Sequence, residues 1–213
     1  MENVTSKAEV VARRDSGLYE LFNYISESRT YRVESSPVSF IQATKGDPEA
    51  GTYEYRLPKI PGSILKDIVS FFILVEQTYQ TEVLVRIYWN PETSEYFLEL
   101  PDQGVTPSSV TTSDPLLYDM YPVMDIHSHC HFDAFFSSVD NQDEVGSRLY
   151  GVVGTVHDRP QFLLRAGTGG NFVSIHDPGQ VFTLDEETRD WYEELSAKME
   201  DKVHPLRDFS NCF

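Results

Sequence analysis

Hydrophobic and polar residues follow two different periodicities along this chain, and together they predict a mixed α/β fold. Dense apolar residues in 61–76, opened by a proline, predict a buried helix. The β-branched and aromatic residues of 81–89 predict a strand directly after it. Alternation over 123–129, bounded by Pro122, predicts another strand near the middle of the chain. We therefore expect a fold built on a central sheet.

Weaker patterns predict the remaining elements. One hairpin is expected from 81–89 and 95–100, and a second from 150–156 and 161–165. The Ser-, Thr- and Pro-rich segment 101–115 is expected to be a loop. Short alternating or amphipathic segments predict further strands at 30–33, 38–42, 52–57 and 171–175, and helices at 17–25 and 184–202.

The composition narrows the classes of protein that need to be considered. A length of 213 residues with 40% hydrophobic content suits one folded domain, or one domain with an appendage. The net charge of −17 argues against nucleic-acid binding, which needs Lys and Arg to neutralise phosphates. The two cysteines, far apart in sequence, indicate a reducing compartment. With no apolar run of transmembrane length and no signal-like start, we expect a cytoplasmic protein without a membrane partner.

Four polar residues near the middle of the chain have the spacing of a metal site. His127 and His129 lie two apart on a predicted strand, so both side chains point to one face. Ser137 and Asp140 lie three apart in a predicted helix start over 137–144, so they are neighbours. This set suits a zinc ion that keeps one position for water. Alternatively, Ser-x-x-Asp is an ordinary capping pattern and His-x-His occurs in plain strands.

The spacing His127-x-His129, seven residues, Ser137-x-x-Asp140 resembles the core motif of the JAMM metalloproteases, also called JAB or MPN-plus. That family includes zinc isopeptidases that remove ubiquitin and ubiquitin-like proteins. The resemblance implies a JAB/MPN-like domain, with a cytidine-deaminase-like central sheet flanked by helices. It also requires a Glu where the first helix gives way to a strand. Glu82 stands at that junction, whereas the competing Glu76 lies inside the predicted helix.

Segments 134–140, 148–154 and 164–167 are similar to the JAB-type A protein of bacterial ParB-related, ThiF-related cassettes. Such cassettes also encode proteins similar to ubiquitin-activating and ubiquitin-conjugating enzymes, so the implied partners are these proteins and a ubiquitin-like protein or its conjugates. The resemblance implies three parts of the chain: an N-terminal extension over 1–58, a catalytic domain over 59–182, and a C-terminal helix and tail over 183–213.

The resemblance implies a role for each residue. His127, His129 and Asp140 would hold Zn²⁺, which makes hydroxide available at neutral pH. Glu82 would act as the general base and then the general acid. Ser137 would donate to the developing oxyanion, or cap the helix that carries Asp140, or do both.

The expected function is hydrolysis of an amide bond after the C-terminal tail of a ubiquitin-like protein, in a bacterial conjugation or mobile-element system. The alternatives are a non-catalytic MPN-type binding module and a metal-dependent hydrolase of small-molecule amides.

Several residues around the motif remain open. Many family members have Pro or Gly after the second His, but this chain has Cys130 and His131, a candidate thiol nucleophile or extra ligand. Among the nearby aromatics, Phe132 is expected to contact substrate, and Phe135 and Phe136 to belong to the core. The remaining histidines are read as turn or tail residues: His157, His176 and His204.

Overall fold

The computed structural model describes residues 51–112, 114–117, 119–183 and 191–206, and the backbone of the strands that lie before residue 51. The helical elements are α1 (Gly62–Tyr79), α2 (Asp140–Asp143), η1 (Pro178–Gln180) and α3 (Trp191–Lys202). The strands are β1 (Arg14–Asp15), β2 (Leu18–Tyr19), β3 (Thr30–Arg32), β4 (Val38–Thr44), β5 (Asp47–Tyr55), β6 (Leu84–Asn90), β7 (Glu95–Glu99), β8 (Gln103–Thr106), β9 (Ser109–Thr112), β10 (Tyr121–His129), β11 (Arg148–Gly154), β12 (Gln161–Thr168), β13 (Asn171–Ser174) and β14 (Val203–Pro205).

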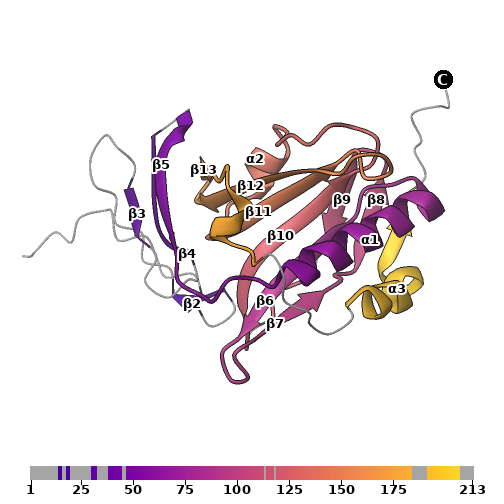
Figure 1. Ribbon diagram of the computed structural model, residues 1–213, viewed down its shortest axis with the longest axis horizontal. Helices are drawn as coiled ribbons and strands as arrows, with labels where there is room; N and C mark the ends of the chain where they lie inside the picture. Colours follow the sequence, from indigo (N-terminus) through magenta and orange to yellow (C-terminus); the bar gives the residue numbers. More distant parts are fainter. Residues whose placement is uncertain are drawn as a thin grey trace, which may run out of the picture.

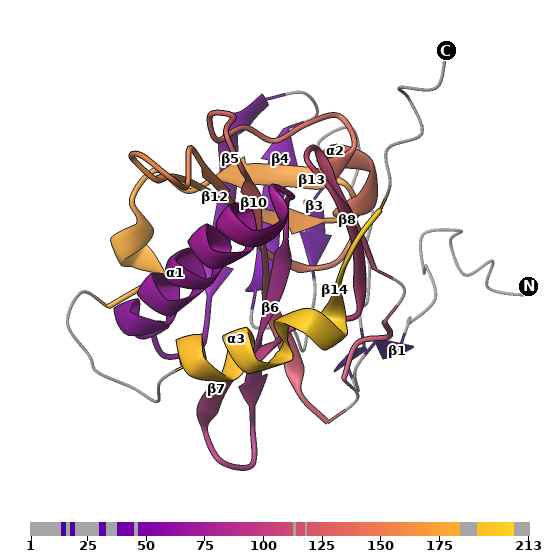
Figure 2. The ribbon, with the colours of Figure 1, turned by 90° about the vertical axis from the view of Figure 1, so that its right-hand side faces the viewer.

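A six-stranded mixed sheet organises the molecule, in the order β13-β12-β11-β10-β6-β7. Its strands are antiparallel except for β10 and β11, which run parallel. Helix α1 lies across one face of this sheet with α3 beside it (Figure 1 and Figure 2). The small sheet β3-β4-β5 packs near β13, and β14-β8-β9 forms another. The expectation of a mixed α/β fold is confirmed.

The predicted buried helix and both predicted hairpins are confirmed. Helix α1 begins after Pro61 and ends at Tyr79. The next residue, Gln80, caps it with a left-handed backbone (φ 55°), and its N–H donates to the carbonyl of Glu76. Its apolar stripe is buried against the central sheet. Strand β6 pairs with β7, and β11 pairs with β12, as expected. Within the described residues, no helix is long and apolar enough to cross a membrane.

The prediction of a loop over 101–115 was wrong. Most of this segment forms the β8–β9 hairpin, and β14 from the chain's far end adds a parallel strand to β8. The Gln103 side chain both donates to and accepts from the backbone of Leu84, so a distant strand holds the hairpin in place. Thr106 and Ser109 hydrogen-bond through their hydroxyls across the turn. Ser and Thr therefore support strand structure here.

Three other segments also differ from the predictions or lie partly outside the described residues. Strand β10 starts at Tyr121 and runs through Pro122, because a register shift between Pro122 and Met124 accommodates the residue that lacks an N–H. In the segment 17–25, expected to be helical, the structure describes only Leu18–Tyr19, which is the strand β2; the rest lies outside the described residues. The helix expected over 184–202 is α3, and 184–190 are likewise outside the description.

Gly154 lets the chain pass closely over the end of the parallel strand pair. It lies opposite His129 in the β10–β11 register. A Cβ at Gly154 would overlap the backbone of Asp133 and Ala134, in the segment that leaves β10. A larger residue at position 154 would therefore displace this segment.

Gly154→Ala is expected to lower the free energy of unfolding by about 3 kcal/mol, because backbone atoms must move to admit the methyl group. The matched control is Gly170→Ala. Its Cβ meets nothing, but its φ of +74° strains an alanine, which costs about 1 kcal/mol. Urea unfolding of both variants measures the difference. Equal losses would show that segment 133–134 yields freely.

Candidate metal centre

His127 and His129 lie at the carboxyl end of β10 on the same face, as the alternation predicted. Their Nε2 atoms are 3.1 Å apart, and both side chains are buried. Burial lowers the pKa of His127 to about 4 and lowers that of His129 as well. Both imidazoles are therefore neutral near pH 7, the form in which histidine binds a metal.

Asp140 adds a carboxylate to the two imidazoles. Its Oδ1 lies 3.6 Å from Nε2 of His127. Its Oδ2 accepts a 2.6 Å hydrogen bond from the backbone N–H of Ser137, and the Ser137 hydroxyl accepts from the N–H of Asp140 at 3.1 Å. This reciprocal pair has the form of a capping box, but α2 itself begins at Asp140, with Val139 as its N-cap and no side-chain cap bond. The helix itself is shorter than expected, because α2 covers only Asp140–Asp143.

The spacing of the three donors fits a tetrahedral metal. Zinc bonds of about 2.0–2.1 Å place two ligand atoms of a tetrahedron about 3.3 Å apart. The His127–His129 and His127–Asp140 separations, 3.1 Å and 3.6 Å, bracket that value, and one donor atom from each of the three residues lies within 4.8 Å of the others. The same 3.1 Å separation suits an N–H···N hydrogen bond between the two neutral imidazoles when no metal is bound.

Glu82 lies between α1 and β6 and lines the same cavity as the three donors. Glu82 is only 5% exposed. Its burial, and to a lesser extent repulsion from Asp140, raises the pKa of its carboxyl to about 8. Its backbone N–H donates to the carbonyl of Thr106 at the β8–β9 turn. Glu82 is therefore anchored from one side by the unpredicted hairpin.

Ser128, between the two histidines, anchors the Glu82 segment from the other side. It faces away from the donors, and its Oγ accepts from the N–H of Val83 at 3.0 Å. Its own N–H donates to the carbonyl of Val83, also at 3.0 Å. No role was predicted for Ser128. The available signal was strand alternation, which places the Ser128 side chain on the face opposite to that of the two histidines.

Arg165 on β12 holds the segment that carries Asp140. It donates to Asn141 Oδ1 at 2.6 Å and to Glu144 Oε2 at 2.8 Å. Its guanidinium carbon lies 3.7 Å from the ring centres of both Phe136 and Phe172. Segment 164–167, which contains Arg165, was singled out only for its family resemblance. The role of Arg165 was not predicted, because it depends on contacts between residues that are far apart in the sequence.

A cavity of about 910 Å³ contains Glu82, His127, His129, Ser137 and Asp140 together. Its remaining lining includes the β9 strand and a charged group formed by Arg86, Asp125 and Arg148, in which Arg148 lies 3.4 Å from Asp125. The structure thus brings together all five residues predicted for the site.

Exposed apolar side chains surround this cavity. Phe132 is 54% exposed and lines the cavity, and its contact with substrate stays a prediction. Phe135 is 48% exposed and its ring meets that of His129 edge-on, so its assignment to the core was wrong. Phe136 is half-buried on Arg165. Val139 and Val145 add further exposed apolar surface.

The thiol alternative at Cys130 finds no support. Burial, then Glu82 and Glu76, raise the pKa of the thiol to about 12, so it is protonated near neutral pH and a poor nucleophile. The backbone at Cys130 has a φ of 22°, in the region that favours glycine. The competing Glu76 lies within α1, is not part of the cavity lining, and pairs with His131 instead.

Neither the protein-family models nor the curated proteins compared with this chain match it. The fold and the donor set therefore define a mixed α/β protein with a candidate metal centre of His127, His129 and Asp140.

The protein, dialysed without added metal, is expected to retain one zinc per chain at this centre, and His129→Ala is expected to lose it, because two ligands hold zinc far less tightly than three. Metal analysis of both proteins measures this. His204→Ala is the matched control, since His204 pairs with Asp102 in the small sheet. Equal zinc content in wild type and His129→Ala would remove His129 from the ligand set.

Proposed function

We propose that this protein is a JAMM-type zinc metallopeptidase that hydrolyses the amide bond after the C-terminal tail of a ubiquitin-like protein. The observation that carries the proposal is the buried donor set of His127, His129 and Asp140 beside Glu82 in one cavity. The six-stranded mixed sheet with α1 across it is compatible with the JAB/MPN-like, cytidine-deaminase-like domain that the motif implies.

Zinc held by the three donors would supply Lewis acidity, which polarises a carbonyl and brings the pKa of water to about 7. Glu82 then moves the proton. A cation beside it favours its carboxylate and lowers the raised pKa toward neutrality, so the group can both take and give a proton. Its carboxylate takes the proton of the attacking water and passes it to the leaving nitrogen.

The Ser137 hydroxyl can donate a hydrogen bond to the reacting substrate. Its oxygen accepts from the N–H of Asp140, so its own O–H is available to donate into the cavity that it lines. A donor at that place stabilises the oxyanion that develops on the substrate carbonyl. Capping and catalysis are thus compatible at the same side chain.

Two features of the cavity favour a polypeptide substrate over a small amide. The β9 strand is the edge of its small sheet and lines the cavity, so a substrate tail can add to it as a further strand. Exposed Phe132, Phe135 and Val139 offer apolar surface for a protein partner. A pure binding module does not need Glu82 buried beside a complete ligand set.

The cellular setting is proposed from the motif resemblance. We place the protein in the bacterial cytoplasm, in a conjugation, mobile-element or defence system with activating- and conjugating-enzyme-like partners. A ubiquitin-like protein encoded beside this chain is the substrate of choice for testing, with ubiquitin as the second.

Glu82→Gln keeps the shape of the side chain but cannot take a proton, so turnover is expected to fall about a hundredfold or more while zinc is retained. The assay follows release of a reporter amine from the tail of the ubiquitin-like protein, with metal analysis alongside. Glu95→Gln, an exposed carboxylate on β7, is the matched control. A fully active Glu82→Gln with an inactive Glu76→Gln would move the base role to Glu76.

Phe132→Ala is expected to raise KM several-fold without loss of zinc or of thermal stability, because its exposed ring contributes to capture of the substrate. Leu163→Ala removes an exposed side chain of β12 outside the cavity lining and is the control. Steady-state kinetics and melting curves measure both variants. An unchanged KM, or a melting change that accounts for the whole effect, would make Phe132 structural.

A further inference from the structure

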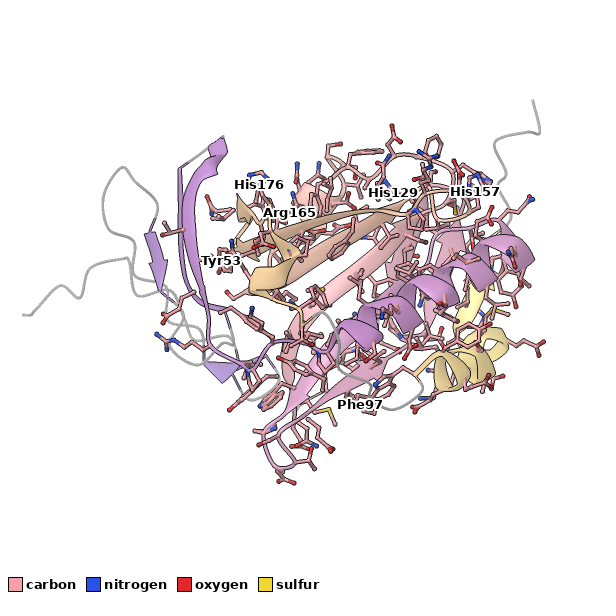
Figure 3. The ribbon with its side chains drawn as sticks, viewed as in Figure 1. Tyr53, Phe97, His129, His157, Arg165 and His176 are labelled. Atoms are coloured by element: carbon pink, nitrogen blue, oxygen red, sulfur yellow. The ribbon has the colours of Figure 1, made fainter. Side chains whose placement is uncertain are left out.

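A second group of metal-ligating side chains lies just past the end of β10. Glu76 comes from the last turns of α1, His131 from the turn after β10, and His157 from the turn between β11 and β12. His131 Nε2 lies 3.4 Å from Glu76 Oε1, and its Nδ1 lies 3.4 Å from Nδ1 of His157. Figure 3 shows His157 and His129 near the same end of the sheet.

Backbone hydrogen bonds hold the two histidine turns together. The N–H of Thr155 donates to the carbonyl of Phe132 at 2.7 Å, and the N–H of Val156 donates to that of Cys130 at 3.1 Å. These bonds flank His131 on one turn and precede His157 on the other. The backbone hydrogen bonds between the two turns therefore hold the imidazoles close together, with ring centres 4.8 Å apart.

Glu76 is the least expected member of this group, because it is a carboxylate only 7% exposed. A buried carboxylate is costly unless a cation or several hydrogen bonds stabilise it. Among the described residues, the ion-pair partner of Glu76 is His131. Two imidazoles and one buried carboxylate are a donor set that suits zinc and similar transition metals.

The two donor groups share no residue. His129 faces the cavity of the candidate metal centre, whereas the cavity lining includes neither Glu76 nor His131 nor His157. Occupation of one group therefore does not exclude occupation of the other.

We propose that Glu76, His131 and His157 form a second, structural zinc site that ties the end of α1 to the turns after β10 and β11. A metal takes one nitrogen of His131, and one donor atom from each residue already lies within 4.8 Å of the others. His131 and His157 are exposed and able to close the remaining gap, so this site is weaker than the buried one. Because Glu76 precedes Glu82 by one short segment, the metal would also steady that segment.

Zinc titration by calorimetry tests the proposal on protein that already carries its tightly bound zinc. Wild type is expected to bind one further equivalent, and His131→Gln and His157→Gln to bind it at least tenfold more weakly. Glu76→Gln is expected to weaken binding similarly. The further equivalent should raise the melting temperature of the wild type but not that of His157→Gln.

Two variants separate this site from other binding. His129→Ala disrupts the first centre, so retention of the further equivalent there shows that the second site stands even if the proposed function fails. His204→Gln removes an exposed histidine that lies 3.1 Å from Asp102 and belongs to neither donor group of the described residues, so this variant should bind zinc as the wild type does. Absence of any further zinc equivalent in the titration of the wild type, or unchanged binding by His157→Gln, would overturn the proposal.

Discussion

The placement of β10 between two strands is the constraint on which both donor groups depend. Hydrogen bonding to β6 on one edge and β11 on the other continues to the end of the strand, where His127 pairs with Leu84 and His129 with Gly154. A strand held on both edges cannot slip by one residue without reversing its faces. The same register aims the two histidines into the cavity and Ser128 toward Val83, so ligands and base segment are fixed by one strand.

Sequence patterns were sufficient where local periodicity decides the structure. The apolar stripe of α1 and the alternation of β10 predicted the elements, and alternation alone placed His127 and His129 on one face. The β8–β9 hairpin was missed because its stability comes from the distant Leu84 and from β14. The grouping of Glu76 with His157 was missed for the same reason, since α1 and the β11–β12 turn meet only in the folded chain.

Three carboxylates gather at this end of β10 with little exposed surface. Glu76 and Glu82 are buried and Asp140 is half-buried, and the ion-pair partners of Asp140 and Glu76 in the described residues are imidazoles. Burying such a group of carboxylates costs free energy, and a bound cation lowers that cost by neutralising their charge. Metal binding would then contribute to folding itself, because the donors come from separate parts of the chain and are assembled only in the native state.

The bond from the Glu82 N–H to the Thr106 carbonyl has a consequence for redesign and for divergence of this architecture. The β8–β9 hairpin looks like a detachable module, exposed at its tip and suited to exchange for one with different surface chemistry. Its turn nevertheless supplies the acceptor that orients the acid beside the histidines. Exchange of the hairpin is therefore constrained in its length and turn geometry as well as at the buried Gln103 and Val105, whereas the exposed side chains at its tip are free to vary.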